Sequence, residues 1–307
     1  MKQDYRTAVP QAELKASAST RAELLAKWGF EPLSMMWMSK IHDRTLDVLV
    51  EDTLAQGSYI EHNYNVRDGA LAQTPTIVVE RFLKFYTEPG DIVLNPMMER
   101  CGHLLIANKL KRAAIGQDIC ERFYKHDVEK VKRRILSAET LDSHNNKIVF
   151  EDENHFLTLF NGLPFELRKG DSRKLEINSD SIDHITTSPP YWDLGIYGDE
   201  EGQVGSGSET YEEFLTKLGE IFAECYRVLK PNKFMCVQVN DFRKGGEFYD
   251  YHGDVSRLLK SLGFKYWDIV IYNLSLHPLA AVFTSQLQDR MMFAKNHEYN
   301  IVVKKVI

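Results

Sequence analysis

The residues with the clearest chemical potential lie together in Ile185–Trp192, which reads I-T-T-S-P-P-Y-W. The largely apolar run Ser181–Ile185 leads into them and is typical of a short buried strand. Pro189 and Pro190 fix their own φ angles and lack N–H donors, and each disfavours a helical conformation in the residue before it. The sequence therefore predicts a stiff, extended elbow at the carboxyl end of a strand. In open α/β sheets that edge is where ligands bind.

Such an elbow suits recognition of a flat ring that carries an amino group. The Ser188 hydroxyl and the Pro189 carbonyl can accept hydrogen bonds from an exocyclic NH2 group. Tyr191 can stack on the face of the ring, and Trp192 can help to close the wall. Two prolines alone would indicate only a turn after a core strand, with its aromatic side chains packed. The whole string T-S-P-P-Y-W favours the functional interpretation.

This string resembles the catalytic motif of the amino-group DNA methyltransferases, which methylate N4 of cytosine or N6 of adenine. The resemblance implies that Ser188, Pro189, Pro190 and Tyr191 are catalytic. The S-P-P-Y form is more similar to the cytosine-N4 members than to the adenine-N6 members. The resemblance also implies S-adenosyl-L-methionine (AdoMet) as the cofactor and DNA as the partner.

Further segments extend the resemblance over about residues 73–307. Thr87–Pro96 resembles the S-x-P-G-D-x-V-L-D-P-F start of the family's AdoMet motif, Ala114–Ile119 its ribose-binding G-x-D-I, and Gly170-Asp171 its G-D-x-x-x-L. The pattern alone gives a strand–loop–helix–strand unit ending in Asp118, and an acid there can bind ribose hydroxyls or cap the next helix. The candidate cofactor residues are Gln73, Thr74, Asn95, Pro96, Arg100, Gly102, Asp118, Ile119 and Asp171.

The loop after Asn95-Pro96 departs from the family pattern. Glu99 and Cys101 stand where D-P-F-x-G-x-G-T-T has glycines. Glycine tolerates a positive φ and the close approach of a ligand. The departure leaves three alternatives open: an active enzyme, a silent relative that binds DNA or a protein partner, and an enzyme that uses an altered AdoMet derivative. In the last case Arg100 would face the extra acid group.

Alternating strands and helices predict an α/β fold. The resemblance implies a doubly wound, mostly parallel, seven-stranded Rossmann-like methyltransferase sheet whose last strand is antiparallel. We expect an N-terminal extension over residues 1–60 and a methyltransferase domain over 61–307. Residues 138–165 and 273–296 are candidate target-recognition insertions. The basic helix 121–137 and Arg243-Lys244 are candidate contacts to DNA phosphates.

Composition narrows the class of protein. The net charge of −6 means that DNA would have to meet a local basic strip. The four cysteines show no C-x-x-C spacing, so we expect reduced thiols, no metal site and a cytoplasmic location. None of them follows a proline, the usual context of the thiolate for carbon-5 cytosine methylation. No apolar run approaches the length of a membrane span. The sequence leaves the oligomeric state open.

Overall fold

The computed structural model describes residues 26, 35–37, 76–137, 145–195, 197–205, 207–273, 291 and 297–307. The chain divides into Met1–Leu33 and Ser34–Ile307. In the first unit the described residue is Ala26, which is helical. Within the described ranges, no helix is both long enough and apolar enough to span a bilayer.

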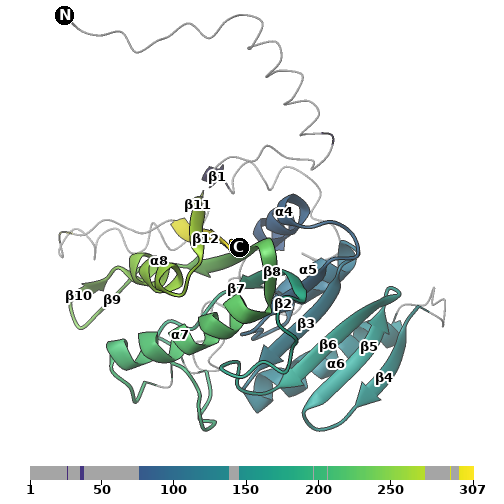
Figure 1. Cartoon of the computed structure of the whole chain (residues 1–307). Helices are drawn as coiled ribbons and strands as arrows, with labels where there is room; N and C mark the ends of the chain where they lie inside the picture. Colours follow the sequence, from purple (N-terminus) through teal and green to yellow (C-terminus); the bar gives the residue numbers. More distant parts are fainter. Residues whose placement is uncertain are drawn as a thin grey trace, which may run out of the picture. The chain divides into compact units, whose positions relative to one another are not determined.

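The second unit is built on a ten-stranded sheet in the order β1-β11-β12-β8-β7-β2-β3-β6-β5-β4 (Figure 1). A separate hairpin pairs β9 with β10. The strands are β1 (Met35–Trp37), β2 (Ile92–Asn95), β3 (Ala113–Asp118), β4 (Lys147–Glu151), β5 (His155–Phe160), β6 (Leu163–Lys169), β7 (Ile182–Thr187), β8 (Leu229–Val239), β9 (Phe242–Lys244), β10 (Glu247–Tyr249), β11 (Lys265–Asn273) and β12 (His297–Lys304).

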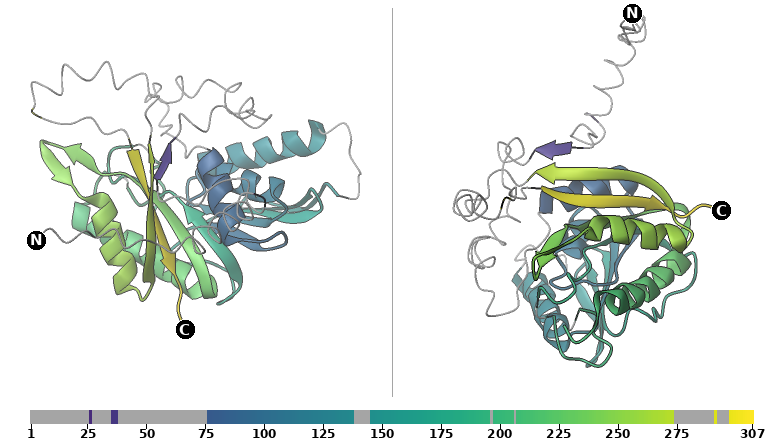
Figure 2. Two further views of the ribbon diagram at one scale, coloured as in Figure 1. Left: turned by 90° about the horizontal axis from the view of Figure 1, so that it is seen from above. Right: turned by 90° about the vertical axis from the view of Figure 1, so that its left-hand side faces the viewer.

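Helices cover both faces of this sheet, as the views of Figure 2 also show. On one face, α7 and α8 pack on β7, β8 and β12 through a core that includes Phe214, Phe222 and Val255. On the other face, α4, α5 and α6 pack through two clusters that include Leu83 and Val131. The helices are α4 (Thr76–Tyr86), α5 (Gly102–Lys109), α6 (Glu121–Ser137), α7 (Tyr211–Val228) and α8 (Tyr251–Ser261).

The strand directions confirm the expected doubly wound fold. β8, β7, β2, β3 and β6 are parallel neighbours, and the last strand, β12, is antiparallel to both β8 and β11. The predicted count of seven strands is wrong, because β1 extends one edge and the β5–β4 hairpin extends the other. The added strands leave the order around β7 unchanged.

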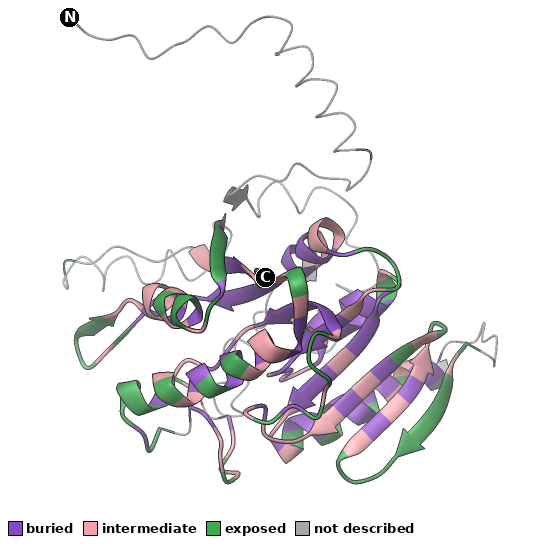
Figure 3. Ribbon diagram, viewed as in Figure 1, coloured by how far each residue is buried: buried purple, intermediate pink, exposed green. Residues whose placement is uncertain are grey.

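The segment 138–165, a candidate target-recognition insertion, contains regular secondary structure. From Lys147 onward it forms β4, β5 and the start of β6, paired antiparallel in sequence order. Phe156 and Thr158 of β5 are fully buried, whereas all five residues of β4 are exposed (Figure 3). Most of the other candidate insertion, 273–296, and the predicted boundary at residues 60–61 lie outside the described residues.

Local sequence signals set the ends of the helices that support the site. The expected capping box is present at α7: the Thr210 side chain accepts from the Glu213 N–H, and the Glu213 side chain accepts from the Thr210 N–H. Asp250 caps α8 by accepting from the Gly253 N–H. Gly263 follows α8 with φ 96°, a conformation that glycine adopts without steric cost.

We predict that Thr210→Ala lowers the free energy of unfolding by about 1 kcal/mol, because it removes one of the two capping hydrogen bonds. Urea unfolding at neutral pH measures the change. The control is Thr216→Ala on the same helix, whose hydroxyl only bonds back to the Glu212 carbonyl; its effect should stay within about 0.5 kcal/mol. Equal losses in the two variants would contradict the capping role.

Candidate active site

The carboxyl ends of β2, β3, β6 and β7 meet at one edge of the sheet, because these strands are parallel neighbours. The loops that follow them enclose a pocket together with residues before and within α6 and α7. The pocket is lined by Pro96, Met97, Glu99, Asp118, Ile119, Phe123, Asp171, Ser172, Ser188, Pro190, Tyr197, Gly202, Gln203, Val204 and Ile221. Residues far apart in the sequence therefore share one cavity at the edge that the pattern predicted.

Six of the residues singled out from the sequence line this pocket: Pro96, Asp118, Ile119, Asp171, Ser188 and Pro190. The others are placed differently. Asn95, Arg100, Gly102, Pro189 and Tyr191 are not among the lining residues. Gln73 and Thr74 lie outside the described residues.

Asp118 joins the two loops on its side of the pocket. Its Oδ2 accepts from the Glu99 N–H at 2.9 Å, and its Oδ1 accepts from the Cys120 N–H at 2.9 Å. The bond to Cys120, just before α6, fits the alternative role of helix capping. The position in the pocket wall fits the ligand role as well. Because each carboxylate oxygen has further lone pairs, one role does not exclude the other.

Glu99 and Cys101 have a backbone conformation that glycine adopts more easily than other residues. Both have φ 46°, in the left-handed region, and Cys101 is the N-cap residue of α5. Gly102 does not take over this conformation; it is the first residue of α5. The loop is therefore shaped like a glycine loop, at the steric cost of about 1–2 kcal/mol that a side chain pays in this region.

Three buried carboxyl groups surround this loop, and burial is the main cause of each pKa shift. Burial raises the pKa of Glu99 to about 8. It raises the pKa of Asp118 to about 7, although the two backbone N–H donors oppose the shift. Burial also raises the pKa of Asp127, in α6, to about 6, against a hydrogen bond from His126. At neutral pH the wall beneath the pocket thus carries less negative charge than its composition indicates.

Asp171, one of the candidate cofactor residues, is paired with Arg173. Its carboxylate accepts from the Arg173 guanidinium and from the Arg173 backbone N–H. Burial opposes ionisation of Asp171, but these bonds outweigh it, and the pKa of Asp171 lies below its usual value. Asp171 is therefore an anion in the pocket wall.

The elbow after β7 is held from both sides. The Tyr251 hydroxyl, from the start of α8, donates to the Pro190 carbonyl at 2.7 Å. The Tyr191 N–H donates to the Tyr197 hydroxyl at 2.8 Å. In contrast, the Ser188 hydroxyl and the Pro189 carbonyl have no hydrogen-bond partner among the described residues. The two acceptors needed for an amino group are thus available on a fixed support.

The aromatic residues of the elbow are packed rather than loose. The Tyr191 ring lies 5.6 Å from the Tyr251 ring and 6.4 Å from the Phe242 ring. The Trp192 indole donates to the Glu209 carbonyl at 2.8 Å and lies under the Lys244 ammonium, 4.2 Å from the ring centre. These contacts fix the orientation of the elbow before any ligand arrives.

Sequence reasoning missed the loop 197–205 as a wall of the cofactor side. Tyr197, Gly202, Gln203 and Val204 line the pocket. The loop is anchored by Glu200, which accepts from the Glu121 N–H at the start of α6 at 2.8 Å. No motif in this loop could have revealed the contact with α6, which depends on the folded arrangement.

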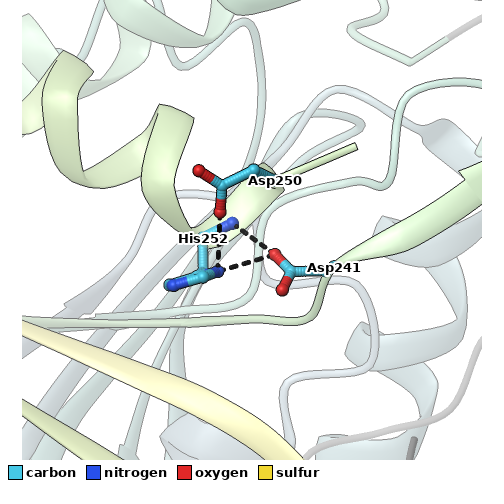
Figure 4. A group of neighbouring side chains, drawn as sticks. All are labelled: Asp241, Asp250 and His252. Atoms are coloured by element: carbon cyan, nitrogen blue, oxygen red, sulfur yellow. Dashed lines mark hydrogen bonds and ion pairs between the residues drawn. The ribbon is translucent and has the colours of Figure 1, made fainter. Parts of the chain in front are cut away.

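A second polar group lies beyond the elbow, where β8 ends and α8 begins (Figure 4). His252 Nδ1 lies 2.7 Å from Asp241 Oδ1 and 3.1 Å from Asp250 Oδ1. With a proton on Nδ1, these contacts are hydrogen bonds that tie the end of β8 to α8. The His252 ring also stacks on Tyr299 of β12, with 4.0 Å between ring centres. An imidazole and two carboxylates can hold a divalent ion, but their mutual bonds already explain the arrangement.

Comparison with known proteins finds a family match that includes the elbow. Residues 182–307 match the model of the N6/N4 family described as DNA methylase. The Type II methyltransferase M.MwoI of Methanothermobacter wolfeii is 32% identical over 141 residues, which cover 43% of this chain and 20% of that protein. M.SfiI of Streptomyces fimbriatus is 34% identical over 92 residues, 29% of this chain and 21% of that protein. M.Cfr9I of Citrobacter freundii is 43% identical over 63 residues, 20% of each chain.

The chain thus spans about a fifth of the length of these relatives. The family match begins at β7 and includes the elbow, α7, β8, α8, β11 and β12. The resemblance to the N4/N6 amino-methyltransferases that the S-P-P-Y string indicated is confirmed.

We predict that Glu99→Gly raises the free energy of unfolding of the ligand-free protein by about 1 kcal/mol, because glycine adopts φ 46° without strain. Urea unfolding at pH 7 provides the measurement. The matched control is Lys111→Gly, an exposed residue with φ 68°. A greater gain in Glu99→Gly than in Lys111→Gly would reflect removal of a buried carboxyl group. A loss of stability in Glu99→Gly would show that the backbone at Glu99 is not strained.

Proposed function

We propose that this protein transfers a methyl group from AdoMet to the exocyclic amino group of a DNA base, with N4 of cytosine as the preferred target. The observation that carries the proposal is the elbow Ser188–Tyr191. It follows β7 at the edge of the sheet where the pocket opens, and Ser188 and Pro190 line that pocket. Base recognition and cofactor binding would then share one wall.

The pocket residues fit AdoMet. Asp118 ends the second strand of the βαβ unit, where an acid can bind ribose hydroxyls. The loop Met97–Cys101 keeps the left-handed backbone that the family's glycines provide. Glu99 Oε1 is buried with no hydrogen-bond partner among the described atoms. A buried orphan oxygen costs about 1–3 kcal/mol, so a polar or charged ligand that reaches it would recover part of that cost.

Bound AdoMet would supply an electrophilic methyl group on a sulfonium sulfur. The amino nitrogen of the base is a poor nucleophile, because its lone pair is delocalised into the ring. Hydrogen bonds from its two protons to Ser188 Oγ and the Pro189 carbonyl would favour a pyramidal nitrogen whose lone pair is exposed. The same acceptors would stabilise the positive charge that the nitrogen gains as the new N–C bond forms, the methyl–sulfur bond breaks and a neutral thioether leaves. The N-methylated cation then loses one proton to solvent.

Ser188 is the reason to prefer cytosine. The family resemblance of S-P-P-Y favours the cytosine-N4 members, and a neutral hydroxyl is the acceptor in this chain. A target base inside a duplex must be flipped out to reach the elbow. The packed rings of Tyr191 and Trp192 are suited to receive it.

The β9–β10 hairpin is a better candidate for DNA contact than the basic helix α6. Within α6, Lys125 is paired with Glu121, and Lys132 with Glu129 and Glu151. In the hairpin, Lys244 is likewise paired with Asp193, so the preference rests on position: Arg243 and Lys244 lie beside the elbow, and Lys244 lies against Trp192. Its position allows phosphate contacts next to a flipped base.

We predict that Ser188→Ala lowers methylation of DNA by about a hundredfold or more, because one of the two acceptors for the amino group is lost. Mass spectrometry of nucleosides from DNA of expressing cells measures N4-methylcytosine and N6-methyladenine directly. Ser181→Ala, just before the same strand, is the control and should retain full modification. Wild-type methylation by Ser188→Ala would remove the elbow from the mechanism.

We predict that Asp118→Asn weakens the binding of AdoMet and the binding of its demethylated product by similar factors, about tenfold each, because both ligands carry the ribose. For the parent, both affinities should rise as pH increases through about 7, where Asp118 ionises. Calorimetric titration at two pH values tests this. Unchanged affinities in the variant would show that Asp118 only caps α6.

A further inference from the structure

Glu99 is the polar residue of the pocket that the family pattern does not explain. Its side chain lines the cavity, and its Oε1 is buried without a hydrogen-bond partner among the described residues. Its backbone is held at φ 46°, where a side chain is costly. Strained positions with unsatisfied groups are typical of functional sites. The pocket thus presents an acid to the ligand, although both the strained backbone of Glu99 and its buried, unpartnered oxygen make folding less favourable.

Charged and titratable groups reach Glu99 from several elements. Arg100 in the same loop and Arg122 of α6 favour its ionised form, whereas Asp118 at the end of β3 and Asp127 of α6 oppose it. From the loop 197–205, the Tyr197 hydroxyl also lies close enough to interact electrostatically.

At the far side of the pocket, Asp171 is balanced by Arg173, and Glu200 adds to the negative charge around Asp118. Burial outweighs all of the charges on Glu99 and raises its pKa to about 8. In the empty pocket Glu99 is therefore mostly a neutral acid at pH 7.

We infer that Glu99 makes the pocket select the positively charged cofactor over its uncharged, demethylated product. This inference rests on the proposed use of AdoMet. The two ligands share the adenosine and the amino acid and differ in one respect: a sulfonium cation in AdoMet becomes a neutral thioether in S-adenosylhomocysteine. A buried carboxyl group can distinguish the two ligands, because a nearby cation favours its ionised form and a neutral thioether does not.

The coupling works through a proton. When a cation enters, Glu99 releases its proton to solvent and becomes the counter-ion. When the product is bound, no cation is present, and Glu99 takes the proton back. The protein therefore buries no unpaired charge, either with AdoMet bound or with the product bound. Selection against the product also favours exchange of product for fresh cofactor.

The ratio of the two affinities isolates this effect. Asp118 titrates in the same range, but it faces a ribose that both ligands carry, so its contribution cancels. Both ligands also carry an α-amino group, and the Glu99 variants leave it unchanged, so comparison of each variant with the parent separates its contribution. Only a group that distinguishes sulfonium from thioether remains in the ratio.

Calorimetric titration of the parent, Glu99→Gln and Glu99→Gly with both ligands provides the test, at about pH 6.5 and about pH 8.5, on either side of the Glu99 pKa. Buffers of different ionisation enthalpy report the protons released. In the parent, the preference for AdoMet should rise with pH by up to about tenfold per unit, with up to one extra proton released relative to the product.

Both variants should lose about tenfold or more of the AdoMet preference at the higher pH, together with the extra proton, while the product affinity changes by less than about threefold. Glu99→Gly covers the case in which the glutamine variant folds poorly. The control is Glu121→Gln, which removes an exposed carboxylate at the start of α6 and should leave the ratio unchanged.

Each outcome has a distinct meaning. Variants that keep the parental preference and proton release overturn the role of Glu99, even if methylation of DNA persists. If neither ligand binds the parent, the proposed function fails, and the inference fails with it. If the control loses the preference as well, the effect belongs to the field of the whole pocket and not to Glu99.

Discussion

The two hydrogen bonds that Asp118 accepts from backbone N–H groups are the constraint on which the pocket depends. They join the loop after β2, through Glu99, to the turn before α6, through Cys120. Glu99 donates its N–H from a left-handed backbone conformation, and its side chain lines the pocket. One carboxylate thus sets the backbone, the charge and the shape of the cofactor side.

Much of the fold could be predicted because its signals are local. Buried apolar runs gave β2, β3 and β7, the predicted helix 121–137 has the bounds of α6, and the Thr210/Glu213 capping box opens α7. The hairpin at the sheet edge could not be found in this way. β4 exposes all five of its residues, so it has no alternation between buried and exposed faces, and it is a strand only because β5 pairs with it.

In the site, too, the features that follow from local sequence could be predicted, and those that depend on long-range contacts could not. The elbow is contained in consecutive residues, so its sequence was sufficient to predict its position after β7, and its chemistry stays a prediction. Glu99 and Cys101 were identified as departures from the family pattern, but their residue types alone could not show that the backbone has φ 46° at both. The wall formed by Tyr197–Gly205 and the anchor of Glu200 on α6 arise from contacts across 79 positions of sequence, which no local pattern encodes.

The bond between the Tyr191 N–H and the Tyr197 hydroxyl gives the site an order of events. Tyr191 belongs to the elbow for the base, and Tyr197 belongs to the loop that covers the cofactor side. Movement of that loop to admit or release a cofactor would pull on the elbow itself. Under the proposed function, cofactor exchange while a base occupies the elbow is therefore disfavoured. Turnover would then follow a compulsory sequence in which the cofactor enters before the target base and leaves after it.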